Sequence, residues 1–176
     1  NWKRCIYMEC AELIDSFAWK HWKNIEAKPD VDNVAIEIVD IWHFVMSYIL
    51  EQNCGHKDID HLVSDVTAVS GFSEFSSYAY IREYSIYEII NDIELIVHET
   101  SGFDLHIGEL LTDFFRVALK CGVSLDILFE KYIGKNVLNK FRQDHGYKEG
   151  SYRKIWGEKE DNEVLLEILA GGTVSV

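Results

Sequence analysis

Proline is almost missing from this chain, since Pro29 is the only one among its 176 residues. Proline fixes one backbone angle and interrupts helices, so its scarcity suits a protein made of helices joined by few rigid turns. Segments that alternate apolar and polar residues with a period of two are also lacking, which disfavours β-strands. The sequence therefore predicts an all-α fold, and its length suits a single domain over residues 1–176.

Basic residues are few as well: 17 Lys and Arg stand against 30 Asp and Glu, which gives a net charge of −13. Such an acidic protein repels phosphates, so we expect no nucleic acid polymer as a partner, whereas a protein that gathers divalent cations fits this balance. No apolar run reaches the length that spans a bilayer and no signal-peptide pattern opens the chain, so we expect no membrane partner.

Cysteine pairs are missing too. The four cysteines, Cys5, Cys10, Cys54 and Cys121, form no C-x-x-C motif, and three of them fall within helical patterns. A reduced thiol in a helix packs like a small apolar side chain. This usage indicates a cytoplasmic protein without a disulfide framework.

What the sequence does contain is an unusual helix over residues 34–50, which read VAIEIVDIWHFVMSYIL. Thirteen of these seventeen residues are apolar or aromatic. The four others, Glu37, Asp40, His43 and Ser47, fall within an arc of about 120° on a helix of 3.6 residues per turn. The helix is therefore apolar nearly all round, with one narrow polar stripe.

A second carboxylate pair precedes it. Glu9 and Glu12 are three residues apart in the helical pattern YMECAELIDSF. Carboxylates at this spacing share a helix face, so two such helices packed antiparallel would bring four oxygen donors together. Oxygen ligands suit Mg²⁺ or Mn²⁺ and not Zn²⁺, and a cation would relieve the repulsion between the carboxylates. The alternative is that each pair lies on a solvated helix surface.

Cations gather near the end of the chain. Residues 132–156, YIGKNVLNKFRQDHGYKEGSYRKIW, hold six of the seventeen basic residues. Lys135, Asn139 and Arg142 share a helix face, and Tyr147 follows Gly146 in a loop with further cations. This arrangement favours a phosphate clamp, and a basic surface patch is the alternative.

Residues 19–23 read WKHWK and also allow two interpretations. They are either the end of an amphipathic helix or an aromatic and cationic wall that contacts a ligand.

Hydrophobic periodicity and capping residues predict the helices. Ser85 and Glu88 form a capping-box signature, and Asp30 or Asp32 is a candidate N-cap. The chain opens in a helical pattern and closes on a stretch unlike a helix end, so we expect further residues at both ends. Residues 71–84 are a loop or a short irregular helix. The predicted helices cover residues 2–19, 58–70, 85–99, 105–120 and 124–143. A further predicted helix begins after the N-cap at residue 30 or 32 and ends at residue 51.

Three blocks of the chain carry a resemblance to a known family: Glu9–Lys23, Ile36–Phe44 and Tyr132–Asn162. With these blocks the sequence resembles the dimeric all-α dUTPases, a branch of the all-α NTP pyrophosphatase superfamily. The two carboxylate motifs indicate the superfamily, whereas GKN, FRQ-x-x-GYK and EDN in the third block indicate the dUTPase branch. The segment 53–84 matches no part of the family pattern and is expected to be a variable insert.

The resemblance implies a helical bundle with a central four-helix metal-binding core, and a cytoplasmic homodimer. It implies hydrolysis of dUTP and dUDP to dUMP with release of pyrophosphate or phosphate, which limits uracil incorporation into DNA. Two or three Mg²⁺ ions, with Mn²⁺ as a substitute, would be the cofactor, and Glu12, with Glu9, would act on the attacking water. The implied metal ligands are Glu9, Glu12, Glu37 and Asp40; the implied phosphate contacts are Lys135, Asn139, Arg142, Tyr147 and Lys154; and Trp22, His43 and Phe44 would lie near base and sugar.

One feature of the family has no counterpart here. A helix upstream of the first carboxylate motif carries the Gln and Asn side chains that read the uracil edge, and this sequence begins after that point. The resemblance therefore supplies cation-binding and phosphate-binding residues, but no residue that selects uracil.

Three other functions remain open from the sequence. A nucleoside triphosphate pyrophosphatase of broader base choice would use the same metal site. A di-iron or di-manganese bundle needs Glu-x-x-His pairs, and no His lies three residues after Glu9 or Glu12, although His43 lies three after Asp40. A non-catalytic helical interaction module would expose its acidic stripe to solvent.

Overall fold

A computed structural model describes residues 1–20, 22–23, 26–78 and 83–171 of the chain. Its contacts divide the chain into two compact units, unit 1 over Asn1–Asp126 and unit 2 over Ile127–Val176, which are described separately below. The expectation of a single domain stays a prediction.

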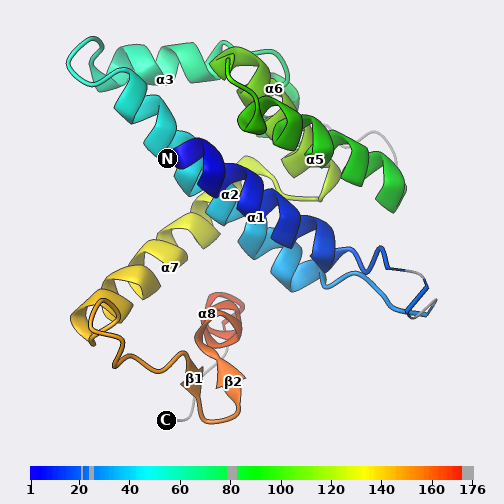
Figure 1. The fold of residues 1–176 in the computed structure, drawn as a ribbon, viewed down its shortest axis with the longest axis vertical. Coiled ribbons are helices and arrows are strands. Elements are labelled where there is room, and N and C mark those ends of the chain that lie inside the picture. Colours follow the sequence, from blue (N-terminus) through cyan, green and yellow to red (C-terminus); the bar gives the residue numbers. More distant parts are fainter. Residues whose placement is uncertain (21, 24–25, 79–82, 172–176) are drawn as a thin grey trace. The chain divides into compact units, whose positions relative to one another are not determined.

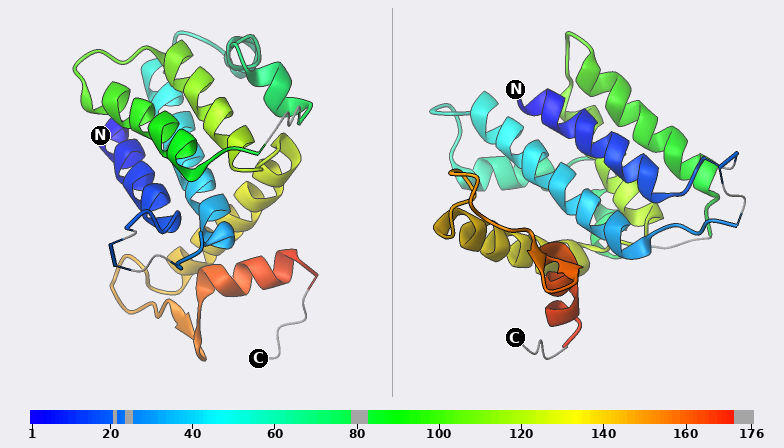
Figure 2. Two further views of the ribbon diagram at one scale, coloured as in Figure 1. Left: turned by 90° about the vertical axis from the view of Figure 1, so that its right-hand side faces the viewer. Right: turned by 60° about the horizontal axis from the view of Figure 1, so that its bottom comes forward.

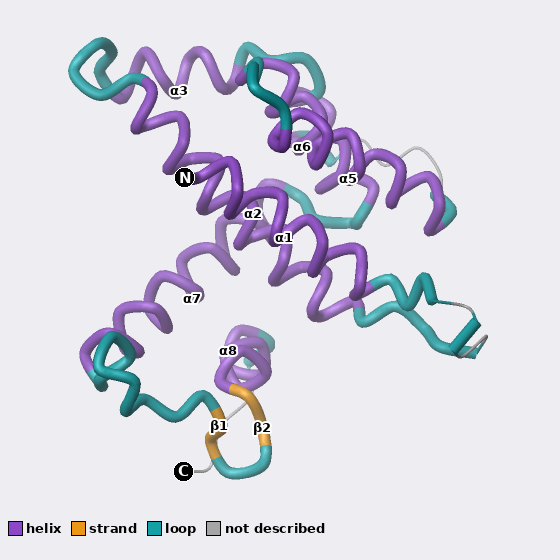
Figure 3. Tube along the Cα trace, in the orientation of Figure 1, coloured by secondary structure: helices purple, strands orange, loops and turns teal. Residues whose placement is uncertain are grey.

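The described residues are mostly helical, which confirms the predicted all-α fold (Figures 1 and 3). The helices are α1 Trp2–Ser16, α2 Val31–Gln52, α3 Ile59–Thr67, α4 Phe72–Ser76, α5 Ile86–Ser101, α6 Ile107–Lys120, α7 Leu125–Asp144 and α8 Asp161–Leu169, and a short antiparallel pair joins β1 Ile155–Trp156 to β2 Lys159–Glu160.

Helices α1 and α2 pack side by side and run antiparallel, because the end of α1 is bonded to the start of α2. The backbone N–H of Asp30 donates to the carbonyl of Ser16 at 2.9 Å. Asp30 is also the N-cap of α2, since its side chain accepts from the backbone N–H of Asn33 at 3.1 Å. This cap agrees with the sequence prediction and fixes where α2 begins relative to α1.

The core of unit 1 lies among α1, α2, α5 and α6, and Figure 2 (right) shows α1 between α2 and α5. Aromatic side chains connect α2 to α6, since the ring of Trp42 stacks on that of Phe114 with centroids 4.9 Å apart. Phe115 packs in turn on Phe75 of α4 at 5.0 Å, and the side chains of Phe75, Phe114 and Phe115 are fully or almost fully buried. A buried apolar core therefore supports α2, and α1 packs against α2 and α5 of the same core.

Helix α2 is long and apolar enough to cross a membrane by length and composition alone, contrary to the expectation from the sequence. Half of its most apolar stretch is buried inside the protein, however, and its buried residues include Glu37. These are the properties of the central helix of a folded core.

Several element boundaries differ from the predictions. Helix α1 ends at Ser16 and not at Trp19, because Ala18 has a positive φ of 53° and the carbonyl of Ser16 accepts from Asp30. Within 71–84 the described residues contain the short helix α4. The predicted capping box is confirmed: the Ser85 hydroxyl accepts from the backbone N–H of Glu88, and the Glu88 carboxylate accepts from the backbone N–H of Ser85.

Unit 2 consists of most of α7, a loop, the two short strands and α8. Neither the strands nor α8 was predicted from the sequence, because strands of two residues are too short to show a period. Gly134 lets α8 approach α7 closely: a Cβ built at this glycine would lie 3.1 Å from methyl carbons of Leu165 and Leu169. Gly146 permits the turn after α7, since its φ is +85°.

Candidate active site

The antiparallel packing of α1 and α2 brings the two carboxylate pairs together. Glu9 and Glu12 lie on α1, and Glu37 and Asp40 lie on α2. One carboxylate oxygen from each of Glu9, Glu37 and Asp40 lies within 4.8 Å of the other two. The structure therefore brings together three of the four side chains that the sequence predicted as metal ligands, and this group is called the carboxylate triad below.

Glu37 is the most buried member of the triad, with only 6% of its surface exposed. Burial and, to a smaller extent, the negative charges of Asp40, Glu9 and Glu12 together raise the pKa of its carboxyl to about 8, although a hydrogen bond from Asn33 opposes the shift. The ordinary value is 4.5. Protonation of Glu37 therefore stabilises the metal-free fold, fully below about pH 4.5, and this contribution is lost as the pH rises through 8.

One oxygen of Glu37 lacks a partner. Its Oε1 accepts from the Asn33 side chain at 3.1 Å, but Oε2 is buried and has no hydrogen bond among the described residues. A buried carboxylate oxygen without a partner is costly, and a bound cation would satisfy it. The donor set is all oxygen, which fits a hard divalent cation such as Mg²⁺ or Mn²⁺.

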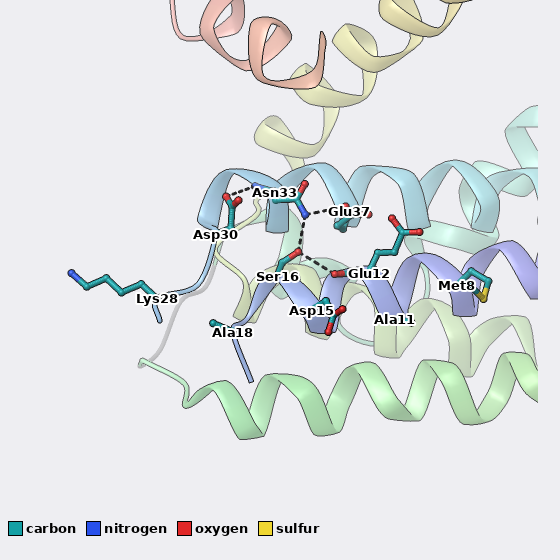
Figure 4. Close-up of a pocket in the computed structure, with 10 residues that line it drawn as sticks. All are labelled: Met8, Ala11, Glu12, Asp15, Ser16, Ala18, Lys28, Asp30, Asn33 and Glu37. Carbon is teal, nitrogen blue, oxygen red and sulfur yellow. Dashed lines mark hydrogen bonds between the residues drawn. The ribbon is translucent and has the colours of Figure 1, made fainter. Parts of the chain in front are cut away.

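Glu12 lies outside the triad and faces a pocket next to it (Figure 4). The pocket has a volume of about 510 Å³ and is lined by both α1 and α2, including Glu12 and Glu37. Glu12 is exposed, and its charge contributes to the raised pKa of Glu37. A carboxylate in this position, close to the triad but open to water, is suited to bind a water molecule or its proton.

The three side chains predicted near base and sugar lie at different places in unit 1. His43 lies one turn beyond Asp40 on α2, and its Nδ1 is 3.0 Å from the carbonyl oxygen of Val39. The ring of Phe44 stacks on Trp2 with centroids 6.0 Å apart. Trp22 is 62% exposed and packs edge-on against Trp19 in the loop after α1. Their role in nucleotide binding stays a prediction, and His21 of the same aromatic segment lies outside the described residues.

Arg142 holds the interior of unit 2 together. Its guanidinium makes a bidentate pair with Asp161, through Nε to Oδ2 at 2.8 Å and Nη2 to Oδ1 at 2.7 Å. Asp161 is 1% exposed and also accepts from the hydroxyl of Tyr152 at 2.8 Å. The pair raises the pKa of Arg142, and hydrogen bonds from Arg142 and Tyr152 hold the pKa of Asp161 below its ordinary value although burial opposes this. Arg142 is therefore a structural cation as well as a predicted phosphate ligand.

Lys135 and Asn139 belong to the same network, which confirms that they share a helix face with Arg142. The Lys135 ammonium donates to the side chain of Asn162 at 3.2 Å, and Asn139 accepts from Nη1 of Arg142 at 3.3 Å. Lys135 is only 3% exposed. Asn162 also accepts from Nη2 of Arg142 at 3.3 Å, so its amide oxygen joins the two cations.

Tyr147 and Lys154 are the exposed members of the predicted phosphate-binding set. The Lys154 ammonium lies 6.0 Å from the centre of the Tyr147 ring, and the Arg142 guanidinium carbon lies 5.9 Å from it. Tyr147 therefore contacts one buried and one exposed cation. The structure places all five predicted residues in unit 2. Arg142 and Lys154 lie at the ring of Tyr147, and Lys135 and Arg142 both donate to Asn162.

Sequence reasoning assigned no role to four residues that organise these sites. Ser16 and Asn33 support the carboxylate triad, and Asp161 and Asn162 bind the cations of unit 2. The position of Asn33, four residues before Glu37, was an available signal, since residues four apart face each other on a helix. Asp161 and Asn162 belong to the EDN motif of the family resemblance, but no local pattern indicated that Asp161 pairs with Arg142, because the two lie 19 residues apart.

We expect Mg²⁺ binding to release a proton from Glu37. With a pKa of about 8 this carboxyl is mostly protonated at pH 7, and a cation ligand must be deprotonated. Isothermal titration in buffers of different ionisation enthalpy should give close to one proton per site at pH 7, falling toward zero as the pH rises above 8.

Two variants test the assignment of that proton. Glu37→Gln should abolish the release. Glu99→Gln is the matched control, because burial and nearby Asp113 raise the pKa of Glu99 to about 7 although it lies outside the triad. Proton release that persists in Glu37→Gln, or that disappears only in Glu99→Gln, would contradict the assignment.

Comparison with known proteins identifies the family. The model of the dUTPase family matches residues 1–147, which include both carboxylate pairs and all predicted phosphate-binding residues except Lys154. No curated protein matches the chain. The match covers most of the chain and confirms the family predicted from the sequence, whose members use divalent metals. The chain therefore belongs to the dUTPase family in its dimeric all-α form, and it is an enzyme that hydrolyses dUTP and dUDP to dUMP.

Proposed function

We propose that the hydrolysis takes place at the carboxylate triad, with Mg²⁺ as the metal. The observation that carries this proposal is the buried Oε2 of Glu37, which has no partner among the described residues and belongs to a side chain that lies next to two further carboxylates. A solvated acidic surface, as a non-catalytic module would have, does not require a buried carboxyl with a pKa of about 8.

Glu9, Glu37 and Asp40 would hold the cation, and Glu12 completes the set of four ligands when two or three ions bind. Mn²⁺ is expected to replace Mg²⁺ because both prefer oxygen ligands. When bound, the metal neutralises the charge of the phosphates and lowers the pKa of a coordinated water. The protein supplies a site that keeps its oxygen donors fixed on two helices of the rigid core of unit 1.

Glu12 is the proposed catalytic residue, assisted by Glu9. It is exposed at the pocket beside the triad, whereas Glu37 is buried. A carboxylate at this position accepts a hydrogen bond from the attacking water, orients it and takes its proton. The water adds to a phosphorus of dUTP, the bond to the leaving phosphate oxygen breaks, and the products are dUMP and pyrophosphate. With dUDP the second product is phosphate.

The cations of unit 2 are proposed to bind the phosphates. Lys135, Asn139, Arg142, Tyr147 and Lys154 offer donors that match phosphate oxygens. Since Lys135 and Arg142 are buried in their own network, the exposed Lys154 and Tyr147 are expected to make the first contact with substrate. Trp22, His43 and Phe44 are proposed to contact base and sugar.

The remaining features of the proposal follow from the family and from the composition of the chain. We propose that the enzyme works as a homodimer in the cytoplasm, that it has no nucleic acid polymer or membrane as a partner, and that it limits uracil incorporation into DNA. The acidic net charge of −13 supports the exclusion of nucleic acid polymers.

Glu12→Gln should lower the kcat for dUTP by about 10²- to 10⁴-fold, because the substitution removes the proton acceptor but keeps the shape of the side chain. The measurement is pyrophosphate release at saturating Mg²⁺. Glu51→Gln is the control, since Glu51 is an exposed glutamate in the last turn of α2. A Glu12→Gln enzyme with a near wild-type rate and unchanged helicity would refute the catalytic role.

Lys154→Ala and Arg142→Ala should separate substrate binding from stability. Lys154→Ala should raise the KM for dUTP about 10-fold, since a hydrogen bond to a charged group is worth about 1.5–3 kcal/mol, without changing the melting temperature. Arg142→Ala should cost about 3–5 kcal/mol of stability, because it leaves Asp161 buried without its partner.

The control for the lysine is Lys148→Ala, which removes another exposed lysine of the same loop. Equal KM values for the Lys154 and Lys148 variants would show that Lys154 does not bind substrate. An Arg142→Ala protein as stable as wild type would show that its pair with Asp161 does not hold unit 2 together.

Pyrophosphate release from dUTP should depend on Mg²⁺ and exceed release from dCTP, dTTP and UTP. The described site contains carboxylates and cations that bind any triphosphate, so the comparison of the four nucleotides tests base choice separately from hydrolysis. Equal turnover of all four would instead indicate a nucleoside triphosphate pyrophosphatase of broader specificity. Release from dUTP that is independent of metal would contradict the role of the triad.

A further inference from the structure

The side-chain amide of Asn33 lies between Ser16 of α1 and Glu37, the most buried member of the carboxylate triad (Figure 4). Its Nδ2 donates to the hydroxyl oxygen of Ser16 at 2.8 Å and to Oε1 of Glu37 at 3.1 Å. An amide nitrogen carries two hydrogens, so both bonds form at once. Asn33 is therefore the side chain that connects the most buried metal-ligand candidate to the neighbouring helix.

The hydrogen-bond chain has one consistent direction. The Ser16 hydroxyl donates its only hydrogen to the backbone carbonyl of Glu12 at 3.1 Å, so toward Asn33 it must act as acceptor. Asn33 must then present its NH₂ group to Ser16, which also directs NH₂ to the carboxylate of Glu37. When Glu37 is ionised, as a metal ligand must be, the opposite amide orientation would place a carbonyl oxygen against Oε1 of Glu37 and lose both bonds.

We propose that Asn33 is a positioning residue of the metal centre, with Ser16 as the partner that orients its amide. By donating to Oε1 of Glu37, Asn33 fixes the carboxylate and leaves its other oxygen, the buried and unpartnered Oε2, available to a cation beside Glu9 and Asp40. The proposal rests on the proposed function of the triad as a metal site and assigns how that site is held ready for the cation.

Asn33 is itself held in place by the fold. Its backbone N–H donates to the capping carboxylate of Asp30, and the backbone N–H of Asp30 donates to the carbonyl of Ser16. Ser16 is 7% exposed. The amide thus joins a network that begins at the backbone of Glu12 and ends at the carboxylate of Glu37, so the α1 and α2 carboxylates keep a fixed register. Residues that orient ligands in this way contribute strongly to metal affinity.

The test is the affinity for Mn²⁺ alone, without nucleotide, measured from the electron paramagnetic resonance signal of the free ion. Asn33→Ala should weaken Mn²⁺ binding by about 10- to 100-fold, the range found when an outer-shell partner of a metal ligand is removed. Asn53→Ala is the matched control, because Asn53 ends the same helix and donates to the carbonyl of Ile49 at 2.8 Å. The control should bind Mn²⁺ as tightly as wild type.

Ser16→Ala provides the second variant, which keeps Asn33 but removes the acceptor that orients it. Its matched control is Ser47→Ala, since the Ser47 hydroxyl also donates to the carbonyl four residues earlier. Ser16→Ala should weaken Mn²⁺ binding by about 3- to 10-fold, less than loss of the whole amide. If Asn33→Ala does not fold, the difference in Mn²⁺ affinity between Ser16→Ala and Ser47→Ala tests the positioning role without it.

The outcomes distinguish the inference from the metal site on which it rests. Loss of Mn²⁺ binding in Glu37→Gln together with wild-type affinity in Asn33→Ala and Ser16→Ala would overturn the positioning role but keep the site. Wild-type affinity in Glu37→Gln would overturn the site itself. A purely structural role for Asn33 predicts a lower melting temperature of the metal-free protein with unchanged Mn²⁺ affinity, and that result too would overturn the proposal.

Discussion

The chemistry of this protein depends on keeping carboxylates of like charge close together between two apolar helices. Glu37 is almost fully buried, and its ionisation is opposed both by burial and by its acidic neighbours. The carboxylates cannot separate, because α1 and α2 are joined through Ser16, Asp30 and Asn33 and are packed into the core of unit 1. Charge repulsion is therefore relieved by a proton or a cation and not by movement of the helices.

The composition of α2 explains how one helix can support both the core and the site. Its narrow polar stripe carries Glu37, Asp40 and His43, while the other faces supply buried Ile and Val side chains to unit 1. The same apolar character gives α2 the hydropathy of a membrane span. A more polar helix would allow water to reach Glu37 and would lower the pKa that distinguishes this carboxyl from an ordinary surface glutamate.

Local patterns in the sequence predicted the parts of the structure that depend on near neighbours. The spacing of Glu9, Glu12, Glu37 and Asp40 predicted which faces of α1 and α2 carry carboxylates, and the Ser85 capping box predicted where α5 begins. The spacing does not determine how deeply each carboxylate is buried. That Glu37 is buried and Glu12 open to a pocket depends on how the helices pack, which no local pattern contains.

The features that sequence reasoning missed depend on contacts between distant residues. Helix α1 stops at Ser16 because the chain returns and Asp30 bonds to the Ser16 carbonyl. The same holds for Arg142, whose pairing with Asp161 could not be recognised from the basic composition of residues 132–156. From the number of basic residues alone, Arg142 and Lys154 are equivalent candidates for binding a phosphate. Burial separates them, because the guanidinium of Arg142 must keep its pair with the buried Asp161 even when it also contacts a phosphate, whereas exposed Lys154 has no such constraint.

Because buried cations must keep their partners, the buried and exposed cations of unit 2 have different roles. Arg142 and Lys135 are fixed through Asp161 and Asn162, and they give α7, the following loop and α8 a defined relation to one another. Lys154 and Tyr147 lie at the exposed side of this network and keep the freedom to contact a phosphate. The carboxylate triad in unit 1 follows the same principle, since buried Glu37 is held by Asn33 while Glu12 stays open to water. In both units a buried, hydrogen-bonded side chain therefore sets the geometry, and an exposed neighbour makes the first contact with the substrate.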